Sequence, residues 1–181
     1  GSDRVEAALT AADPRGEHDV VVNLQGDLPT LPPSYIRTCL QALEGSAADL
    51  ATLVAPITDE AEAMADSVVK AACAFLPAAS EAGDAGRPAV APALYFSRLP
   101  IPWGPGPRWH HIGIYAWRRA ALARFVALPP SPLERREKLE QLRALEAGMR
   151  IVCAAVPVAP FGVDTAADLD RARALLSPRL T

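Results

Sequence analysis

Apolar and polar positions along the chain predict helices and strands in turn. The stretch DVVVNL (19–24) is a continuous apolar run, which is typical of a strand buried on both faces of a parallel sheet. A helix is expected before it, over residues 3–12, with Ser2 as its N-cap. After it, PPSYIRTCLQALEG (32–45) begins with proline, carries apolar residues at helical spacing and ends at a glycine. The first 45 residues therefore predict helix, strand and helix.

The alternation of strands and helices continues to residue 176. Further strands are expected at LATLVAPI (50–57), SVVKAACAFL (67–76), ALYFSRLPIPW (93–103), HIGIYAWR (111–118) and RIVCAAVPV (150–158). Further helical segments are expected at 59–65, 119–128, 133–148 and 165–176, the last opening with a capping box between Thr165 and Asp168. Residues 77–92 are rich in Ala, Pro and Gly and lack an apolar period, which predicts a surface loop.

These elements predict an α/β fold in one domain over residues 1–181. Strands that alternate with helices indicate a mostly parallel sheet covered by helices on both faces. The proline-rich strands in the middle of the chain indicate an inserted antiparallel layer. The chain has no internal repeat and no linker that would separate two domains.

Composition narrows the class of protein. The sequence contains neither a run of apolar residues long enough to span a membrane nor a signal-peptide pattern, so we expect a soluble, cytoplasmic protein without membrane insertion. The three cysteines are far apart and show no metal-ligand spacing, which favours free thiols in the core.

Residues 1–86 carry four basic and fourteen acidic side chains, whereas residues 87–143 carry ten basic and three acidic ones. That basic excess suits a multiply anionic small molecule, because no nucleic-acid-binding motif accompanies it.

The stretch VVVNLQGDLP (20–29) places polar residues directly after a predicted strand. In open α/β sheets, ligands bind beyond the carboxyl ends of the strands, so Gln25 and Asp27 are expected at the mouth of a site, and Gly26 would allow a close approach of the ligand. A Gly-Asp pair after a strand is also a common turn. From these residues alone, both interpretations stay open.

Several segments in order resemble one enzyme family. VVVNLQGDLPTLPP, ALYFSRLPIPW, HIGIYAWR, SPLERREKLEQLRALEAGMRI and GVDTAADLDRA are similar to segments of the 3-deoxy-manno-octulosonate cytidylyltransferases, or CMP-Kdo synthetases. The resemblance covers nearly the whole chain. It implies a Rossmann-like nucleotidyltransferase that converts CTP and the acid sugar 3-deoxy-manno-octulosonate (Kdo) to CMP-Kdo and pyrophosphate for lipopolysaccharide biosynthesis. It further implies Mg²⁺ as cofactor and a homodimer.

The resemblance also implies roles for individual residues. Asp27 and Asp164 match the family's catalytic carboxylates, which hold magnesium. A second set of residues matches the positions that bind the substrates, chiefly the sugar: Gln25, Arg98, His111, Tyr115, Glu140 and Gln141. An arginine at position 98 suits a carboxylate because its guanidinium binds in a bidentate manner.

The sequence departs from the family at several places. Leu28 replaces the glutamate that usually follows QGD, and the segment between IPW and HIGIY is short, so that Arg108 is a candidate for a second carboxylate-binding arginine. The start of the chain, GSDR, matches a segment well inside the family's domain, so a preceding strand and triphosphate-binding loop are expected to be missing. The 181 residues alone are then not expected to turn over CTP. The alternatives are a cytidylyltransferase for another acid sugar, or a non-catalytic binding or dimerisation module.

Overall fold

A six-stranded sheet forms the centre of the molecule in the computed structural model, which describes residues 1–75, 88–163 and 165–177. The strands are β1 (Val20–Leu24), β2 (Leu50–Pro56), β3 (Lys70–Cys73), β4 (Val90–Ser97), β5 (Trp109–Arg118) and β6 (Ile151–Ala155). Their order is β1-β5-β2-β6-β4-β3, and β3 also pairs with β5. Because of this extra pairing, β5, β2, β6, β4 and β3 close into a ring, with β1 outside it on β5.

The prediction of a mostly parallel sheet is wrong. Within the described part of the chain, β2 and β6 form the one parallel pair, and every other pairing is antiparallel. The long strand β5 lies between β1 and β2 and runs against both. β1 is an edge strand with partly exposed side chains, although its apolar run predicts burial on both faces. The α/β class is confirmed, with a mixed sheet.

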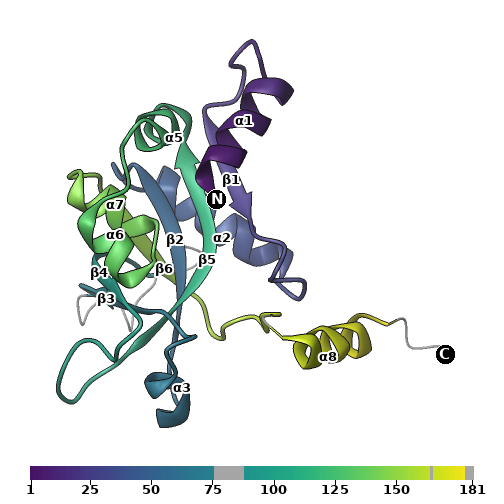
Figure 1. Cartoon of the computed structure of the whole chain (residues 1–181), viewed down its shortest axis with the longest axis vertical. Coiled ribbons are helices and arrows are strands. Elements are labelled where there is room, and N and C mark those ends of the chain that lie inside the picture. The colour runs from purple at the N-terminus through teal and green to yellow at the C-terminus, as the bar shows by residue number, and fades with distance from the viewer. Residues whose placement is uncertain (76–87, 164, 178–181) are drawn as a thin grey trace.

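Helices cover the sheet and divide the core into two clusters (Figure 1). The helices are α1 (Ser2–Ala12), α2 (Pro33–Glu44), α3 (Glu60–Met64), α5 (Arg119–Val126), α6 (Pro132–Glu137), α7 (Gln141–Glu146) and α8 (Ala166–Leu176). One cluster joins α2 to the sheet through Cys39 and Leu43, and the other joins α5 and α7 to it through Phe125 and Leu142. α8 lies to one side of the sheet, beyond β6 in the chain.

The predicted helix over 133–148 is broken into α6 and α7. Lys138, which follows α6, has φ 58° and ψ 44°, a left-handed conformation that stops the helix. The apolar stripe used to predict one helix is buried on both sides of the break, because Leu139 is 6% exposed and Leu142 is 0% exposed. The period of the leucines therefore reports burial here and not helix continuity. The break is the turn that brings Glu140 and Gln141 to the pocket described below.

The helix ends agree with the sequence in part. Thr165 and Asp168 form the predicted capping box of α8. Ser2, the predicted N-cap of the first helix, instead lies inside α1, and its hydroxyl donates to Glu140 Oε2 at 3.0 Å. A capping box between Ser131 and Glu134 starts α6, which the sequence analysis did not anticipate. Such boxes stabilise helix starts by pairing main-chain N–H groups that have no partner within the helix.

The predicted loop over 77–92 lies mostly outside the described residues, but its end is strand. β4 begins at Val90, and residues 90–92 pair with β6. Ala91 is buried while Pro92 is exposed, as alternation in a strand requires. The strand predicted from residue 93 therefore begins three residues earlier, at Val90.

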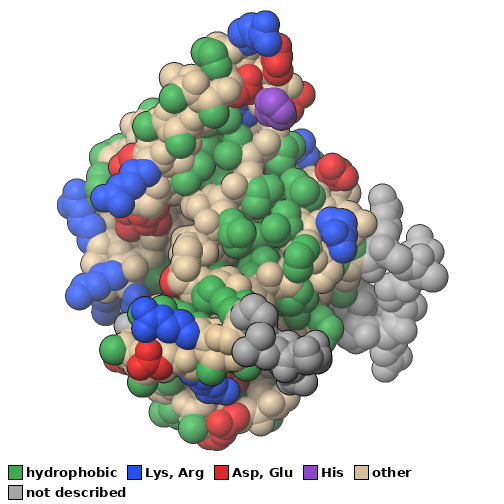
Figure 2. Space-filling model, turned by 90° about the vertical axis from the view of Figure 1, so that its right-hand side faces the viewer, with side chains coloured by type: hydrophobic (Ala, Val, Ile, Leu, Met, Phe, Trp, Pro, Cys, Tyr) green, Lys and Arg blue, Asp and Glu red, His purple; other side chains and the backbone are tan. Residues whose placement is uncertain are grey.

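The surface combines apolar and charged regions. Figure 2 shows one face, on which hydrophobic side chains gather centrally with Lys and Arg around them. None of the described helices has the length and apolar content that crossing a membrane requires.

Candidate active site

One pocket collects the predicted site residues that the structure describes. Its volume is about 470 Å³, and its walls come from the end of β1, the middle of β5, the end of β4 and the junction of α6 with α7. The predicted residues in its lining are Gln25, Asp27, Arg98, His111, Tyr115, Glu140 and Gln141. These residues are up to 116 positions apart in the chain (141 − 25 = 116), so the fold itself brings them together.

Gln25 follows β1, and its side chain lies against Gly113 of β5. A Cβ atom on Gly113 would lie 3.2 Å from Gln25 Oε1, closer than an ordinary van der Waals contact. Gly113 faces the place where the pairing of β2 with β5 shifts between Thr52 and Leu53. The glycine in HIGIY therefore makes room for the Gln25 side chain in the pocket.

His111 is a buried, neutral side chain. Its ring is 7% exposed and lies edge-on to Phe96, with centroids 4.9 Å apart. Burial lowers the pKa of His111 to about 3. Its Nε2 lies 2.9 Å from Thr52 Oγ1, which also contacts the carbonyl oxygen of Ile114 at 2.8 Å. Because the hydroxyl has one proton to donate to a carbonyl, Nε2 carries the imidazole hydrogen and Nδ1 is left as an acceptor.

The neutral state of His111 predicts a loss of stability on acidification. The unfolded chain binds a proton near pH 6.5, whereas the folded chain does so only near pH 3, so the free energy of unfolding falls as pH drops through this window. Between pH 7 and pH 4 we expect a loss of about 3 kcal/mol in urea titrations. His111→Gln, which keeps a donor for Thr52, should remove most of this slope.

Asp13 also makes stability depend on pH, but in a lower pH range than His111, so the same titration distinguishes the two groups. Hydrogen bonds from the main-chain N–H groups of Glu17 and His18, together with one from Arg119, hold the pKa of Asp13 far below 3.8. Its contribution is complete above pH 3.8 and is lost only at lower pH. If wild type and His111→Gln had the same slope between pH 6.5 and pH 4.5, the assignment to His111 would be wrong.

Gln25, Tyr115 and Gln141 are among the polar side chains of the pocket that have no hydrogen-bond partner in the described part of the chain. Burial, and next the negative charge of Glu140, raise the pKa of Tyr115, so its hydroxyl stays protonated as a donor. Gln141 is only 5% exposed and opens α7. A buried polar group is normally paired, so the unpartnered Gln141, together with the half-buried Tyr115 and the exposed Gln25 on the same cavity, fits a polar ligand with several hydroxyl groups.

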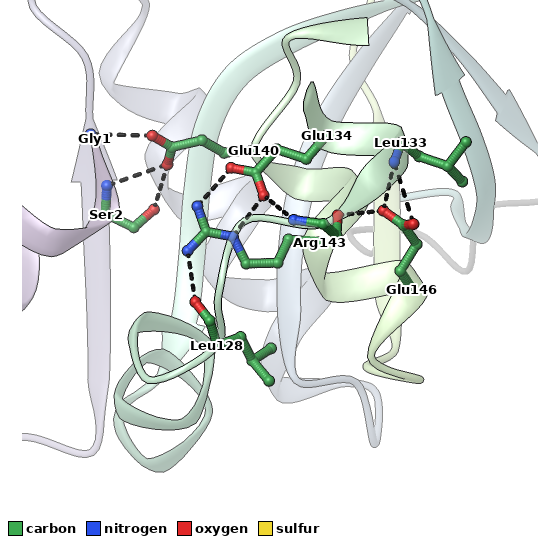
Figure 3. Close-up of polar contacts among 9 residues, drawn as sticks. Gly1, Ser2, Leu128, Leu133, Glu134, Glu140, Arg143 and Glu146 are labelled. Atoms are coloured by element: carbon green, nitrogen blue, oxygen red, sulfur yellow. Dashed lines mark hydrogen bonds and ion pairs between the residues drawn. The ribbon is translucent and has the colours of Figure 1, made fainter. Parts of the chain in front are cut away.

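Glu140 lies at the α6–α7 junction beside the start of α1 (Figure 3). Its carboxylate accepts hydrogen bonds from Ser2 Oγ at 3.0 Å and from the Ser2 main-chain nitrogen at 3.3 Å. Glu140 is thus a hydrogen-bond acceptor on the pocket wall.

Arg98 is fixed with part of its guanidinium unused. Nε donates to the carbonyl oxygen of Glu137 at 3.1 Å, and Nη1 donates to that of Asp66 at 2.9 Å. A guanidinium has five N–H donors, so three have no partner in the described part of the chain. Arg108, the other candidate for carboxylate binding, instead pairs with Glu60 at 3.0 Å and does not line the pocket. A role for Arg108 in carboxylate binding stays a prediction.

Asp27 lies at the edge of the pocket on the turn after β1. Its carbonyl oxygen accepts a hydrogen bond from the main-chain nitrogen of Val163 at 2.9 Å. This bond joins the segment before α8 to the turn after β1. Asp164 lies outside the described residues, so the shared site stays a prediction. Leu28 packs partly buried against the α2 side of the core, and its side chain reaches to 3.9 Å from the Cβ position of Gly162.

The described part of the pocket offers Mg²⁺ one unpaired carboxylate, that of Asp27. Among residues 1–75, 88–163 and 165–177, no group of three His, Cys, Asp or Glu side chains could hold a metal ion. Mg²⁺ usually needs only one or two carboxylates, because water and substrate phosphate complete its shell. Asp27 offers one such oxygen ligand at the pocket, and its carboxylate has no ion-pair or hydrogen-bond partner in the described ranges.

The pocket includes residues that sequence reasoning missed. Asn23, Ser67, His110 and Lys138 also line it. His110 Nδ1 lies 2.6 Å from Glu62 Oε1, so α3 is tied to β5 beside the pocket. Lys138 enters through its left-handed turn, for which a lysine gives no sequence signal. For His110, the signal was its place next to His111 in a predicted strand.

Known proteins that resemble this chain are cytidylyltransferases. A family model described as "Cytidylyltransferase" matches residues 1–151. The chain is 57% identical, over 99% of its length, to a protein of Parvibaculum lavamentivorans named 3-deoxy-manno-octulosonate cytidylyltransferase, and 58% identical, again over 99%, to one of Methylobacterium radiotolerans with the same name. It spans 66% and 68% of the length of these two relatives. A solved structure of CMP:2-keto-3-deoxy-manno-octonic acid synthetase complexed with CTP superimposes with a TM-score of 0.80 at 36% identity, covering 96% of this chain and 66% of that one.

Proposed function

The chain belongs to the cytidylyltransferase family, and from this premise we propose that it carries the acid-sugar site of an enzyme that converts CTP and Kdo to CMP-Kdo and pyrophosphate. The observation that carries the proposal is the convergence, on one pocket, of seven residues to which the family resemblance gives a role. Lipopolysaccharide biosynthesis in the cytoplasm is the expected setting, since CMP-Kdo is the activated form of that sugar.

The chemistry of the pocket fits an acid sugar. The three unused N–H groups of Arg98 suit the sugar carboxylate, because arginine binds carboxylates with two parallel hydrogen bonds. The amides of Gln25 and Gln141 and the Tyr115 hydroxyl offer donors and acceptors for sugar hydroxyl groups. Neutral His111 adds an acceptor without adding charge beside the arginine.

The proposed reaction is a direct transfer. The oxygen of the sugar's C2 hydroxyl attacks the α-phosphorus of CTP, the bond to the β-phosphate oxygen breaks, pyrophosphate leaves, and the hydroxyl proton passes to water. The residues of this pocket bind and orient the sugar, and such positioning supplies much of the rate of a transfer reaction. Magnesium, held by Asp27 and Asp164, would supply positive charge against the triphosphate.

Arg98→Lys tests the assignment of the sugar carboxylate. We expect the KM for Kdo to rise by about 10-fold or more, because lysine cannot form the bidentate contact, while the KM for CTP stays within about twofold. Both KM values are measured by steady-state kinetics on the full product of the reading frame that encodes the chain. Arg124→Lys is the matched control, because Arg124 pairs with Asp49 away from the pocket. Equal changes for both substrates would reject the assignment.

We also propose a homodimer that forms through the segment between β4 and β5. Leu99 is 70% exposed and Trp103 is 98% exposed, and water contact with such large apolar side chains is unfavourable. The Arg108–Glu60 pair and a hydrogen bond from the main-chain nitrogen of Ile57 to the Arg108 carbonyl hold the end of this segment in place. A second copy of the chain is the partner we expect.

Trp103→Ser is expected to convert the dimer to a monomer. In sedimentation velocity, the wild-type 181-residue chain should have twice the chain mass of 19.1 kDa, and the variant should sediment at that mass. Leu175→Ser on α8 removes another exposed apolar side chain, 59% exposed, and should leave the dimer unchanged. A monomeric wild type, or a dimeric Trp103→Ser variant, would contradict the proposed interface.

A further inference from the structure

Arg98 is held by both its main chain and its side chain. Its main-chain nitrogen donates to Glu137 Oε2 at 3.1 Å, and its carbonyl oxygen accepts from Lys70 Nζ at 2.5 Å. Its side chain is bound by the carbonyl oxygens of Glu137 and Asp66, as described above. Two side chains from distant parts of the sequence, Lys70 and Glu137, therefore meet at one arginine.

Lys70 has an unusual environment for a lysine. It is 0% exposed, and its ammonium donates to three carbonyl oxygens, those of Ala65 at 2.6 Å, Val68 at 2.6 Å and Arg98 at 2.5 Å. No salt bridge joins it to a carboxylate in the described part of the chain. Burying a charge without a paired carboxylate is costly. The ammonium holds the 65–68 turn and the end of β4 together, because it donates hydrogen bonds to carbonyl oxygens of both.

Glu137 makes the matching connection from the other side. Its carboxylate accepts from Ser97 Oγ at 3.0 Å and from the Arg98 main-chain nitrogen, with a longer contact to the Tyr95 hydroxyl at 3.4 Å. Glu137 is the last residue of α6, directly before the left-handed turn at Lys138. It therefore fastens the end of β4 to the junction that carries Glu140 and Gln141 into the pocket.

We propose that Lys70 and Glu137 are positioning residues for sugar binding, which act by fixing Arg98 at the wall of the pocket. The proposal rests on the proposed function, in which Arg98 binds the sugar carboxylate. A free arginine loses much side-chain freedom when it binds a ligand, and an arginine fixed beforehand loses little. Loss of either positioning residue should weaken binding of the sugar while leaving CTP binding unchanged.

Kinetics of the variants test the proposal. Lys70→Met keeps the volume and removes the donors, and Glu137→Gln removes the charge from a partly exposed site, so it serves if Lys70→Met fails to fold. Each should raise the KM for Kdo about 10-fold with little change for CTP. Combined with Arg98→Ala, neither should raise it further, because both act through Arg98. Additive effects, or equal effects on both substrates, would overturn the proposal.

Arg118→Met is the matched control for general destabilisation. Arg118 also donates to three main-chain carbonyl oxygens, those of Leu43, Ser46 and Ala48, but it does not line the pocket. This variant should lower the unfolding midpoint without changing the KM for Kdo. If it raised that KM as much as Lys70→Met did, a purely structural role would explain both.

A measurement without substrate separates this proposal from the proposed function. In the ligand-free protein, the NMR signal of the Arg98 Nε–H group reports its bond to the Glu137 carbonyl. We expect hydrogen exchange at this group to accelerate about 10-fold or more in Lys70→Met and Glu137→Gln and to stay unchanged in Arg118→Met. Unchanged exchange in both would disprove the fixing of Arg98, whereas accelerated exchange with no effect on Kdo would leave Arg98 fixed and reject its role in sugar binding.

Discussion

Asp27→Asn is expected to reduce the rate of CMP-Kdo formation by about 100-fold or more at saturating CTP and Kdo. The change removes the carboxylate charge that we assign to magnesium while keeping the size of the side chain, and loss of one preorganised electrostatic contact to the reacting group has effects of this order. Because Asp27 is exposed and, among the residues that the structure describes, accepts hydrogen bonds only through its carbonyl oxygen, the fold should be unaffected.

Asp19→Asn is the control for the Asp27 variant. Asp19 immediately precedes β1 and Asp27 follows it, so the control makes the same chemical change near the opposite end of one strand. Its activity should be that of wild type at every magnesium concentration. An Asp27→Asn enzyme with full activity and an unchanged magnesium requirement would remove Asp27 from the metal site.

Glu134→Gln is expected to lower the free energy of unfolding by about 3 kcal/mol, because it leaves a buried guanidinium without its counter-charge. Glu134 and Arg143 are joined by two hydrogen bonds of 2.7 and 2.5 Å, and their side chains are only 11% and 10% exposed (Figure 3). Arg143 also lies 4.7 Å from the centroid of the Phe125 ring. For a chain of this size, the unfolding midpoint should fall by about 10 °C.

Arg173→Met is the matched control for the buried pair. Arg173 pairs with Asp170 at 3.0 Å, but both side chains are more than two-thirds exposed, and such pairs contribute little. Calorimetry should find its midpoint within about 2 °C of wild type. Similar midpoints for Glu134→Gln and Arg173→Met would contradict the importance of burial.

The sequence predicted the pocket better than the sheet. Polar residues at predicted strand ends, together with the family resemblance, identified Gln25, Arg98 and Tyr115, which the structure brings together. Strand direction could not be predicted, because a run such as VVVNL has the same pattern in either direction. Its apolar character indicated burial on both faces, whereas β1 is an edge strand.

Two structural features of the site have no local sequence signal. The left-handed turn at Lys138 occurs at a residue type that rarely adopts it, inside an apolar period that continues across it. The burial of Lys70 depends on carbonyl oxygens at positions 65, 68 and 98, and loop conformations bring these together. Neither contact follows from pattern or spacing along the chain.

The central claim is that this pocket serves cytidylyl transfer to Kdo. The most direct measurement supplies CTP, magnesium and equal concentrations of Kdo and sialic acid to the full product of the reading frame, and then separates the nucleotide products by chromatography. The account predicts CMP-Kdo and pyrophosphate in equal amounts, with Kdo strongly preferred over sialic acid. Transfer chiefly to sialic acid, or binding of Kdo with no CMP-sugar formed, would contradict it.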